Sequence, residues 1–379
     1  MRVLLPLTLL ATLAGCAQTP DPEPCVCEPA FQQPSYSECP SVTSPSTPSA
    51  DQIAFTKLMQ YLANKVKQEW GEDEYLVAGK HHYVKYIDSY RTRAHIDFDK
   101  GKIWVATIAQ DQPKTHLQQA IVETLLMPAD PSKVDLFSDK NIAASGKPFL
   151  LGQVVDHDGK PIEWQWRANR YANYLLENRL SSKPVRRGKV YYVEIDMVSD
   201  HESQREYQYA HLIRDAAKRY NLSEDLIYAI VKTESSFNPY AVSHAGAYGL
   251  MQVIPKTAGA DVFNLVKGRN DIPTKEYLFD PASNIDTGAA YFHILKTRYL
   301  KEVQNSTSLH YSMISAYNGG TGGVLSTFDS DRKQAMRELN ALHPNQLYTV
   351  LTTQHPKAEA RRYLEKVLKF QKEFNQGTM

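Results

Sequence analysis

Apolar residues in the first part of the chain fall at the spacing of a helix face. Ile53, Leu58, Leu62, Val66 and Trp70 recur mostly every four or five positions, which predicts an amphipathic helix. Leu117 begins a second helical stretch, which Pro128 ends. Between and after these helices come short runs rich in β-branched and aromatic residues, at 75–77, 95–98, 102–108, 149–155 and 190–198. Asp99-Lys100-Gly101 predicts a hairpin turn between two of them. Residues 51–200 are therefore expected to form an α+β domain with a small sheet.

The second half of the chain has a helical pattern instead. Predicted helices cover 207–220, 223–234, 281–300, 309–317, 344–351 and 357–374. Ser223 is a suitable N-cap, and Glu224 and Asp225 complement the helix dipole in the first turn. Asn238-Pro239 breaks the chain after that helix. A mostly α domain is therefore predicted over 201–379.

The N-terminus has the features of an export signal. Arg2 precedes an apolar run over 3–14, which is too short to span a bilayer. The run ends in Leu13-Ala14-Gly15-Cys16, which resembles a bacterial lipobox. A signal peptide over 1–15 is predicted, with Cys16 acylated as a membrane anchor. The alternative is an ordinary cleaved signal beside a chance cysteine. By analogy with lipoprotein sorting, Ala17 favours an outer-membrane lipoprotein that faces the periplasm.

Residues 16–50 are predicted to be a disordered tether. Eight of the 34 residues over 17–50 are proline, and Pro-rich polar segments cannot bury enough apolar surface to order themselves. Cys25, Cys27 and Cys39 lie in this tether, where an oxidising compartment would allow one disulfide. No cysteine follows Cys39, so the folded part must depend on its hydrophobic core.

Charge and composition narrow the functional classes. The formal net charge is +1, so no strong field favours nucleic acid. No glycine-rich phosphate loop and no Cys/His cluster with metal-ligand spacing occurs in the sequence. We therefore predict no nucleic-acid partner, no cofactor and no metal.

Glu234 is the main candidate for catalysis. It ends an apolar helical stretch at 226–231. A carboxylic acid that is partly removed from water there can keep its proton and protonate a leaving oxygen. For an isolated glutamate, a solvated residue at a helix end would be the better interpretation, because most glutamates are exposed.

Three sequence blocks that occur in this order favour a catalytic role for Glu234. They are Glu234-Ser235, then Gly-Ala-Tyr-Gly-Leu-Met-Gln at 246–252, then Ala-Tyr-Asn-Gly-Gly at 316–320. Together they resemble the lysozyme-like lytic transglycosylases of the soluble-lytic-transglycosylase type, over about 205–375. The lipoprotein signal, the segment 52–200 and the residues 352–364 resemble the membrane-bound members of this family, of the transglycosylase C type.

The resemblance implies a lysozyme-like catalytic domain and a set of site residues. Glu234 would be catalytic, and the predicted substrate-binding residues are Ser235, Ser243, Gln252, Tyr317, Asn318 and Tyr363. Ser235 could instead be a plain helix-end serine, and Tyr363 could be core packing. Met251 is expected in the core. Gly249 is expected at a tight turn or a close backbone approach.

The resemblance also implies a reaction with one acid. The sequence has no acidic residue between Glu234 and Asp261, whereas two-carboxylate glycosidases need a second carboxylate nearby. Later aspartates could fold back, but none lies in a nucleophile motif: Asp261, Asp271, Asp280 and Asp286. The implied activity is non-hydrolytic cleavage of peptidoglycan glycan strands, between N-acetylmuramic acid and N-acetylglucosamine, to 1,6-anhydro ends. Complexes with other cell-wall enzymes are a further expectation.

Two rival functions stay open at this stage. A hydrolytic lysozyme could use the same fold and the same acid. A non-catalytic glycan-binding lipoprotein would have no need of Glu234.

The segment 52–200 shows no catalytic constellation. His81-His82 is interpreted as a surface pair. Trp164 and Trp166 would share one face of a strand, as core or interface aromatics in preference to a glycan-binding surface. We hypothesise that this domain lengthens the glycan groove, so that its deletion would lower affinity for long chains without affecting the chemistry.

Overall fold

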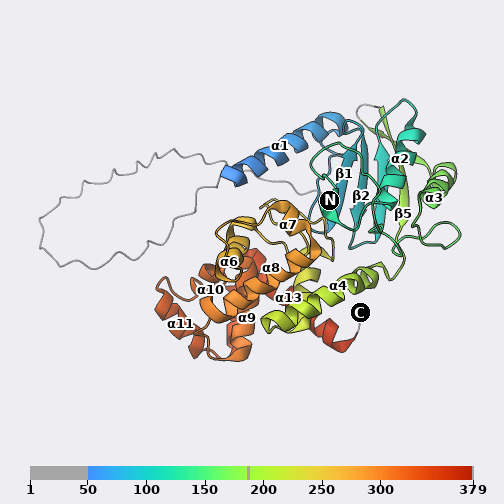
Figure 1. Cartoon of the computed structure of the whole chain (residues 1–379). Helices are drawn as coiled ribbons and strands as arrows, with labels where there is room; N and C mark the ends of the chain where they lie inside the picture. Colours follow the sequence, from blue (N-terminus) through green and yellow to red (C-terminus); the bar gives the residue numbers. More distant parts are fainter. Residues whose placement is uncertain (1–49, 186–187, 378–379) are drawn as a thin grey trace, which may run out of the picture. The chain divides into compact units, whose positions relative to one another are not determined.

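The computed structural model describes residues 50–185 and 188–377, and residues 48–379 form one compact unit (Figure 1). The predicted signal peptide, the acylated Cys16 and the three tether cysteines lie outside the described residues. Ala50, which we assigned to the tether, instead begins the first helix, α1 (Ala50–Trp70). Over the described ranges, no helix is both long enough and apolar enough to cross a membrane.

The sheet has five antiparallel strands in the order β1-β2-β3-β5-β4 (Figure 1). The strands are β1 (His82–Ile87), β2 (Thr92–Asp97), β3 (Lys102–Thr107), β4 (Ser181–Val185) and β5 (Gly188–Asp196). Ile96 pairs with Ile103 across the predicted hairpin, and Val105 pairs with Val193. The hairpin turn contains Gly101, whose φ of +62° suits glycine.

Alternating side chains cover both faces of this sheet. On one face Tyr83 and Val105 pack into a core with α2 (Pro113–Leu125) and α3 (Gln165–Asn178). On the other face Val84 and Ala106 pack against the C-terminal end of α1. Because successive side chains of a strand point to opposite faces, neighbouring residues enter different cores. The N-terminal part of the predicted α1 face, with Ile53 and Leu58, is exposed instead.

Several sequence predictions for this part were wrong. The run 75–77 is not a strand, because the Tyr86 hydroxyl bonds both the N–H and the carbonyl of Leu76 in place of a neighbouring strand. The run 149–155 is a buried loop with isolated bridges, and Gly152 turns it at a φ of +85°. The sequence reasoning missed α3 and β4, and it did not name β1 as a run.

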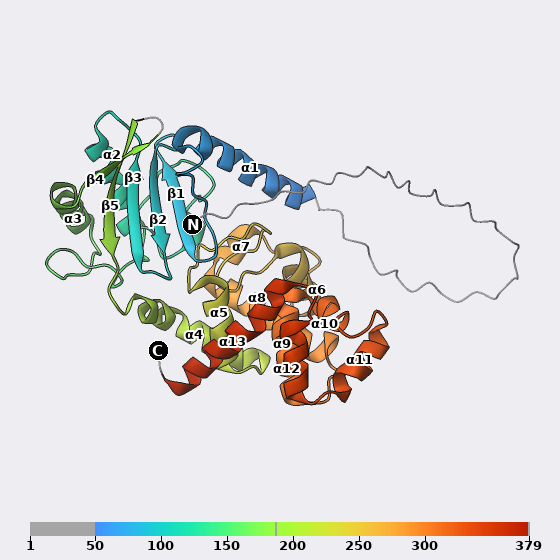
Figure 2. The ribbon, with the colours of Figure 1, turned by 180° about the vertical axis from the view of Figure 1, so that it is seen from behind.

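The rest of the unit is mostly helical, as predicted (Figure 2). Its α-helices are α4 (His201–Tyr220), α5 (Glu224–Ser235), α6 (Ala260–Leu265), α7 (Lys275–Phe279), α8 (Pro281–Ile294), α9 (Ser306–Gly319), α10 (Thr321–Leu325), α11 (Arg332–Ala341), α12 (Pro344–Thr353) and α13 (Ala358–Gln376). Short 3₁₀ and π turns are η1 (Pro131–Lys133), η2 (Pro255–Gly259) and η3 (Leu295–Tyr299).

The helix α5 lies at the centre of this helical part. Ile227, Ile230 and Val231 are fully buried, as the predicted stripe requires. The helix α13 packs against both α5 and α9, so the C-terminal residues reach the end of α5. Ser223 occupies the predicted N-cap position, but its side chain makes no capping hydrogen bond.

Candidate active site

Glu234 is the second-last residue of α5, and only 4% of it is exposed. The chain turns sharply after it, because Ser236 and Phe237 both have positive φ, at 49° and 60°. Non-glycine residues adopt this conformation only where their surroundings hold them there. The turn therefore has to be stabilised from outside α5.

A lysine from the sheet-bearing part faces Glu234. Lys80 Nζ donates to Glu234 Oε2 at 2.8 Å, and it lies 3.8 Å from Glu359 Oε1. Burial lowers the pKa of Lys80, but the carboxylates of Glu234 and Glu359 together outweigh burial and raise that pKa above its ordinary value. Sequence reasoning missed Lys80, since nothing around it distinguishes it from a surface lysine.

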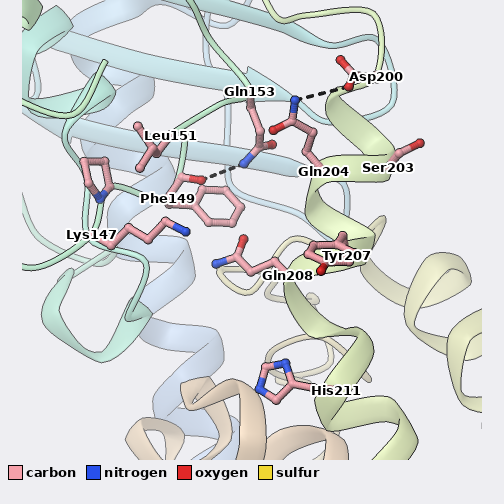
Figure 3. Close-up of a pocket in the computed structure, with 11 residues that line it drawn as sticks. Lys147, Phe149, Leu151, Gln153, Asp200, Ser203, Gln204, Tyr207, Gln208 and His211 are labelled. Atoms are coloured by element: carbon pink, nitrogen blue, oxygen red, sulfur yellow. Dashed lines mark hydrogen bonds between the residues drawn. The ribbon is translucent and has the colours of Figure 1, made fainter. Parts of the chain in front are cut away.

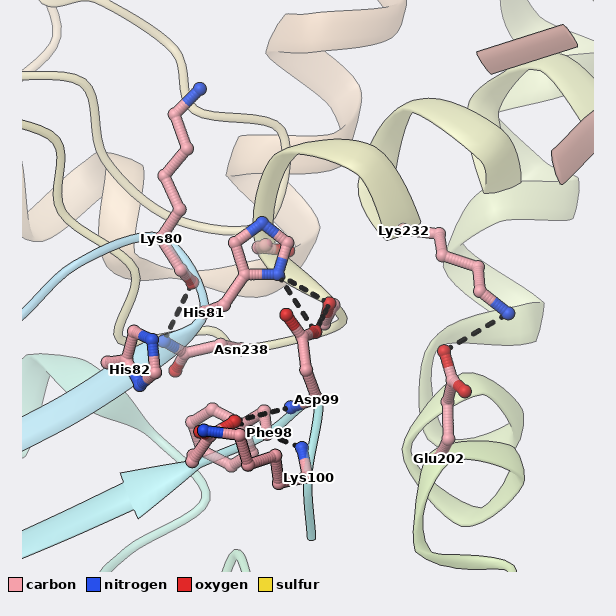
Figure 4. A network of polar contacts seen from close by, with 12 residues as sticks. Lys80, His81, His82, Phe98, Asp99, Lys100, Glu202, Lys232 and Asn238 are labelled. Atoms are coloured by element: carbon pink, nitrogen blue, oxygen red, sulfur yellow. Dashed lines mark hydrogen bonds and ion pairs between the residues drawn. The ribbon is translucent and has the colours of Figure 1, made fainter. Parts of the chain in front are cut away.

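The residues around Lys80 are tied to the loop that follows Glu234 (Figure 4). Asn238 Nδ2 donates to the carbonyl of Lys80 at 3.1 Å. His81 Nδ1 lies 2.6 Å from Ser236 Oγ, and that hydroxyl also donates to Asp99 Oδ1 at 2.6 Å. These bonds fix the backbone of Lys80 to the strained turn.

The surface-pair interpretation of His81-His82 was wrong. His81 joins the network at Ser236, whereas His82 Nδ1 lies 3.3 Å from His95 Nε2 on β2. The two imidazoles are half-buried and have different partners.

Arg205 of α4 connects the same turn to two other segments. It is fully buried. Its Nε donates to the carbonyl of Ser236 at 3.2 Å, and its two terminal nitrogens donate to Gln153 Oε1 and to the carbonyl of Phe98, both at 3.0 Å. Burial lowers the pKa of Arg205 to about 10, which leaves the guanidinium charged at neutral pH. One cation therefore holds the turn after Glu234 against the hairpin end and the loop at 149–155.

Tyr317 and Tyr363 come to Glu234 from α9 and α13. Burial first, and then the charge of Glu234, raise the pKa of both phenols well above the ordinary value. Tyr317 Oη donates to the carbonyl of Met251 at 2.8 Å, and its ring stacks on Phe292 at 4.5 Å. The structure thus brings together Glu234, Tyr317 and Tyr363, which are three of the predicted site residues.

Gln252 and Asn318 also lie near this centre, but Gln252 is buried whereas Asn318 is only half-buried. Gln252 is buried, and its Nε2 donates to the carbonyls of Ala241 and Gly249. Its Oε1 is buried without a hydrogen-bond partner in the described part of the chain. Asn318 is half-buried and donates to Glu359 Oε1 at 3.4 Å.

Among the described residues, no hydrogen bond joins the hydroxyl of either predicted serine to Glu234. Ser235 is fully buried, and its hydroxyl donates to the carbonyls of Val231 and Leu250. It therefore fixes the loop at Leu250 to the end of α5. Ser243 Oγ accepts from the N–H of Ala247. Its hydroxyl closes a local turn, and among the described residues no hydrogen bond joins it to Glu234.

The Gly-Leu-Met-Gln block is a tight turn in the core. Met251 is fully buried, as expected. Gly249 has a φ of +73°, and a Cβ there would lie 2.4 Å from Asn284 Nδ2 and 2.5 Å from the carbonyl of Leu278. Only glycine fits both the conformation and the space.

The four aspartates considered as a second carboxylate have other partners. Asp261 accepts from Tyr299, Asp286 from Lys267, Asp271 from Arg269, and Asp280 from the N–H of Ser283.

The other carboxylate near Lys80 is Glu359, which the sequence reasoning missed. It lies one helical turn before Tyr363 on α13, so the i,i+4 relationship could have identified it. Its side chain is 68% exposed.

Trp164 and Trp166 are not core aromatics. They lie at the N-terminus of α3 and not on a strand, and they are 61% and 58% exposed. Both the strand and the core interpretation were therefore wrong.

A separate cavity lies beside α4 (Figure 3). Its lining includes Lys147, Gln153, Gln204, Tyr207 and His211. None of the predicted site residues lines it. In the ranges that the structure describes, no group of three or more His, Cys, Asp or Glu side chains could hold a metal ion.

Known protein families match both parts of the chain. Residues 211–340 match the transglycosylase SLT domain, and residues 49–208 match the N-terminal domain of membrane-bound lytic murein transglycosylase C. Curated proteins of that name match most of the chain. The one from Klebsiella pneumoniae subsp. pneumoniae is 50% identical over 325 residues, 86% of this chain and 90% of that protein. The one from Salmonella arizonae is 50% identical over 318 residues, 84% of this chain and 88% of that protein.

Two solved structures are also similar in part. Lytic transglycosylase Slt from Pseudomonas aeruginosa has a TM-score of 0.35 and 26% identity, over 44% of this chain and 24% of that one. The 70 kDa soluble lytic transglycosylase from Escherichia coli has a TM-score of 0.33 and 25% identity, over 43% of this chain and 24% of that one.

A buried glutamate at a helix end within an SLT-type domain places the chain among the lytic transglycosylases. Within that class, the matched N-terminal domain and the 50% identity show that it belongs to the membrane-bound lytic murein transglycosylase C family.

Proposed function

We propose that this chain is a peptidoglycan lytic transglycosylase in which Glu234 is both acid and base. The observation that carries the proposal is the burial of Glu234 at the end of α5, facing Tyr317 and Tyr363, in a chain of this family. The substrate is the glycan strand of peptidoglycan. The bond cleaved is the β-1,4 bond between N-acetylmuramic acid and N-acetylglucosamine.

The reaction needs one carboxyl group and no added water. Protonated Glu234 gives its proton to the glycosidic oxygen while the C1–O bond breaks. The 2-acetamido group of the substrate stabilises the cation that develops at C1, as in substrate-assisted glycosidases. Glu234, now a carboxylate, takes the proton of the C6 hydroxyl as O6 bonds to C1. The products are a 1,6-anhydromuramoyl end and a free hydroxyl on N-acetylglucosamine, and Glu234 is protonated again.

The neighbouring residues are suited to positioning the substrate. Gln252 Oε1 is a buried acceptor without a partner among the described residues, and an N-acetyl N–H would satisfy it. The Tyr317 and Tyr363 phenols keep their protons, because burial and Glu234 raise their pKa. The Tyr363 hydroxyl has no hydrogen-bond partner among the described residues, so it can donate to the reacting sugar. The Tyr317 proton is already donated to the carbonyl of Met251, and we assign the Tyr317 oxygen as an acceptor beside the acetamido group. Asn318 and Ser243 are assigned to the outer part of the site.

We further propose a lipoprotein organisation. A signal peptide over 1–15 and an acylated Cys16 would anchor the chain in the outer membrane, with a tether that ends before Ala50 and leads to domains at 50–200 and 201–379. The name of the relatives describes them as membrane-bound, which supports a membrane association for this chain as well. Complexes with other cell-wall enzymes belong to the same proposal.

One observation favours a hydrolytic lysozyme as the second candidate. Glu359 Oε1 and Glu234 Oε2 lie 3.8 Å and 2.8 Å from the same Lys80 nitrogen. A second carboxylate this close could be the nucleophile of a two-carboxylate hydrolase, because retaining glycosidases separate their two carboxyl groups by roughly 5–5.5 Å. Its exposure argues against this role, since a solvated carboxylate that is paired with lysine is a weak nucleophile.

Mass spectrometry of digested murein separates these functions. Residues 48–379 would be tested beside Glu234→Gln and Glu359→Gln. We expect products one water lighter than hydrolysis products, absent with Glu234→Gln and retained with Glu359→Gln. Free reducing ends that disappear with Glu359→Gln would establish a lysozyme. Intact murein that still binds the protein would make the chain a glycan-binding lipoprotein.

A further inference from the structure

We propose that Lys80 is a positioning residue that controls when Glu234 carries its proton, and that the sheet-bearing part of the chain thereby takes part in catalysis. This inference rests on the proposed acid/base role of Glu234. It assigns a function in the reaction to a residue outside the segment that matches the SLT domain, which covers 211–340.

The contact itself favours the ionised form of Glu234. Lys80 Nζ donates to Oε2 at 2.8 Å, and only 5% of the Glu234 side chain is exposed. An ammonium group at that distance stabilises a carboxylate and opposes its protonation. Glu234 must nevertheless be protonated when the glycosidic oxygen arrives. Lys80 therefore has to leave Oε2 for the first step, and its return stabilises the carboxylate that acts as base in the second.

The structure provides for this movement. The backbone of Lys80 is fixed by Asn238, and its neighbour His81 is fixed at Ser236 (Figure 4). The side chain of Lys80 is 31% exposed, so it is not fully enclosed by the protein. Glu359 Oε1, 3.8 Å from Nζ, is a second partner to which the ammonium can turn. A sugar that enters beside Glu234 would drive this exchange by occupying the place of Nζ.

Other charged or titratable groups also face Glu234, and the test must separate them from Lys80. The charge of Glu234 acts on Tyr317 of α9 and on Tyr363 of α13. It also acts on Lys366 of α13. Glu359 lies close to the same Lys80 nitrogen as Glu234. Within the described residues, Lys80 is the one cation with a hydrogen bond to a Glu234 oxygen.

The experiment follows Glu234 directly as well as through activity. In residues 48–379 labelled with ¹³C at the glutamate carboxyl carbons, the resonance that disappears in Glu234→Gln reports Glu234. We expect its titration midpoint to be higher in Lys80→Met than in the wild type, because the substitution removes the ammonium group that donates to Oε2. Lys80→Arg should restore most of the wild-type midpoint. The alkaline limb of kcat/KM, which reports the free enzyme, should move upward in parallel in Lys80→Met.

Lys366→Met is the matched control, because it removes a second cation of the site that has no hydrogen bond to Glu234. A clearly smaller shift is expected from it. An unchanged midpoint in Lys80→Met, or an equal shift in Lys366→Met, would overturn the proposal. A uniform loss of rate without any shift would reduce Lys80 to a structural residue and overturn it too. If the midpoint shifts in a protein that releases no anhydro product, the ion pair between Lys80 and Glu234 is supported and the proposed function is refuted instead.

Discussion

The ring of Tyr240 packs edge-on against that of Tyr83 on β1, with centroids 5.3 Å apart and planes at 72°. Tyr240 lies only six residues after Glu234, yet it is fully buried in the core formed by the sheet, α2 and α3. It also contacts Phe149 edge-on at 5.6 Å, and its hydroxyl donates to the carbonyl of Pro128. The loop that follows the acid is therefore part of the sheet core.

Removal of the Tyr240 ring should destabilise the whole unit. We expect Tyr240→Ala to lower the free energy of unfolding by about 3–5 kcal/mol, as for other buried aromatics. Tyr240→Phe should cost about 1–2 kcal/mol, because it leaves the Pro128 carbonyl without a partner. Urea unfolding of residues 48–379 measures both. Tyr207→Ala is the control, since Tyr207 is 83% exposed. Equal stability of the two alanine variants would contradict this account of the core.

Deletion of the sheet-bearing part should abolish the chemistry. This expectation reverses the hypothesis drawn from the sequence, in which deletion would affect only the affinity for long chains. A fragment over 201–379 would lack the sheet that buries Tyr240, the carbonyl of Phe98 that binds Arg205, and Lys80. The strained turn after Glu234 would lose its support. Activity on short and long glycans should be lost together, and full activity of the fragment on short glycans would favour the lengthened-groove hypothesis instead.

Gly249 should tolerate no side chain. Gly249→Ala places a Cβ 2.5 Å from the Leu278 carbonyl, in addition to the strain at a φ of +73°. We expect a loss of at least about 2–3 kcal/mol, from strain and overpacking combined, and a fall in activity because Met251 and Gln252 shift. Gly268→Ala is a matched control, with a φ of +63° and no atom within 4 Å of the added Cβ. It should cost only about 1 kcal/mol. Thermal unfolding of the two variants compares them, and similar melting temperatures would show that the space around Gly249 is adaptable.

Local sequence patterns identify some parts of the site and not others. The buried stripe of α5 and the break at Asn238-Pro239 are local features, and they correctly predict that Glu234 lies at a helix end. Lys80 cannot be found this way, because its function depends on a contact with a residue 154 positions away. The dependence on distant contacts also explains why the loop at 149–155 was wrongly predicted to be a strand. Its apolar residues are buried by tertiary packing, and its turn at Gly152 is incompatible with a strand.

The half-buried His95 should make stability fall in mild acid. Burial, and then the neighbouring His82 and Arg93, lower the pKa of His95 to about 4. In the unfolded chain the pKa returns to about 6.5. Between these values the unfolded state binds a proton that the folded state does not. The stability is therefore present above about pH 6.5 and is lost as the pH falls toward 4, by up to ~3 kcal/mol.

The substitution His95→Gln tests this, because it removes the proton-binding group. The drop in unfolding free energy between pH 7 and pH 4.5, measured by urea titration, should be about 2 kcal/mol smaller than in the wild type. The variant should also be less stable at pH 7, since His95 stacks on Trp104 with centroids 5.1 Å apart. His244→Gln, at an exposed position, should show the wild-type drop. The same drop in His95→Gln as in the wild type would mean that other groups cause the loss of stability in acid.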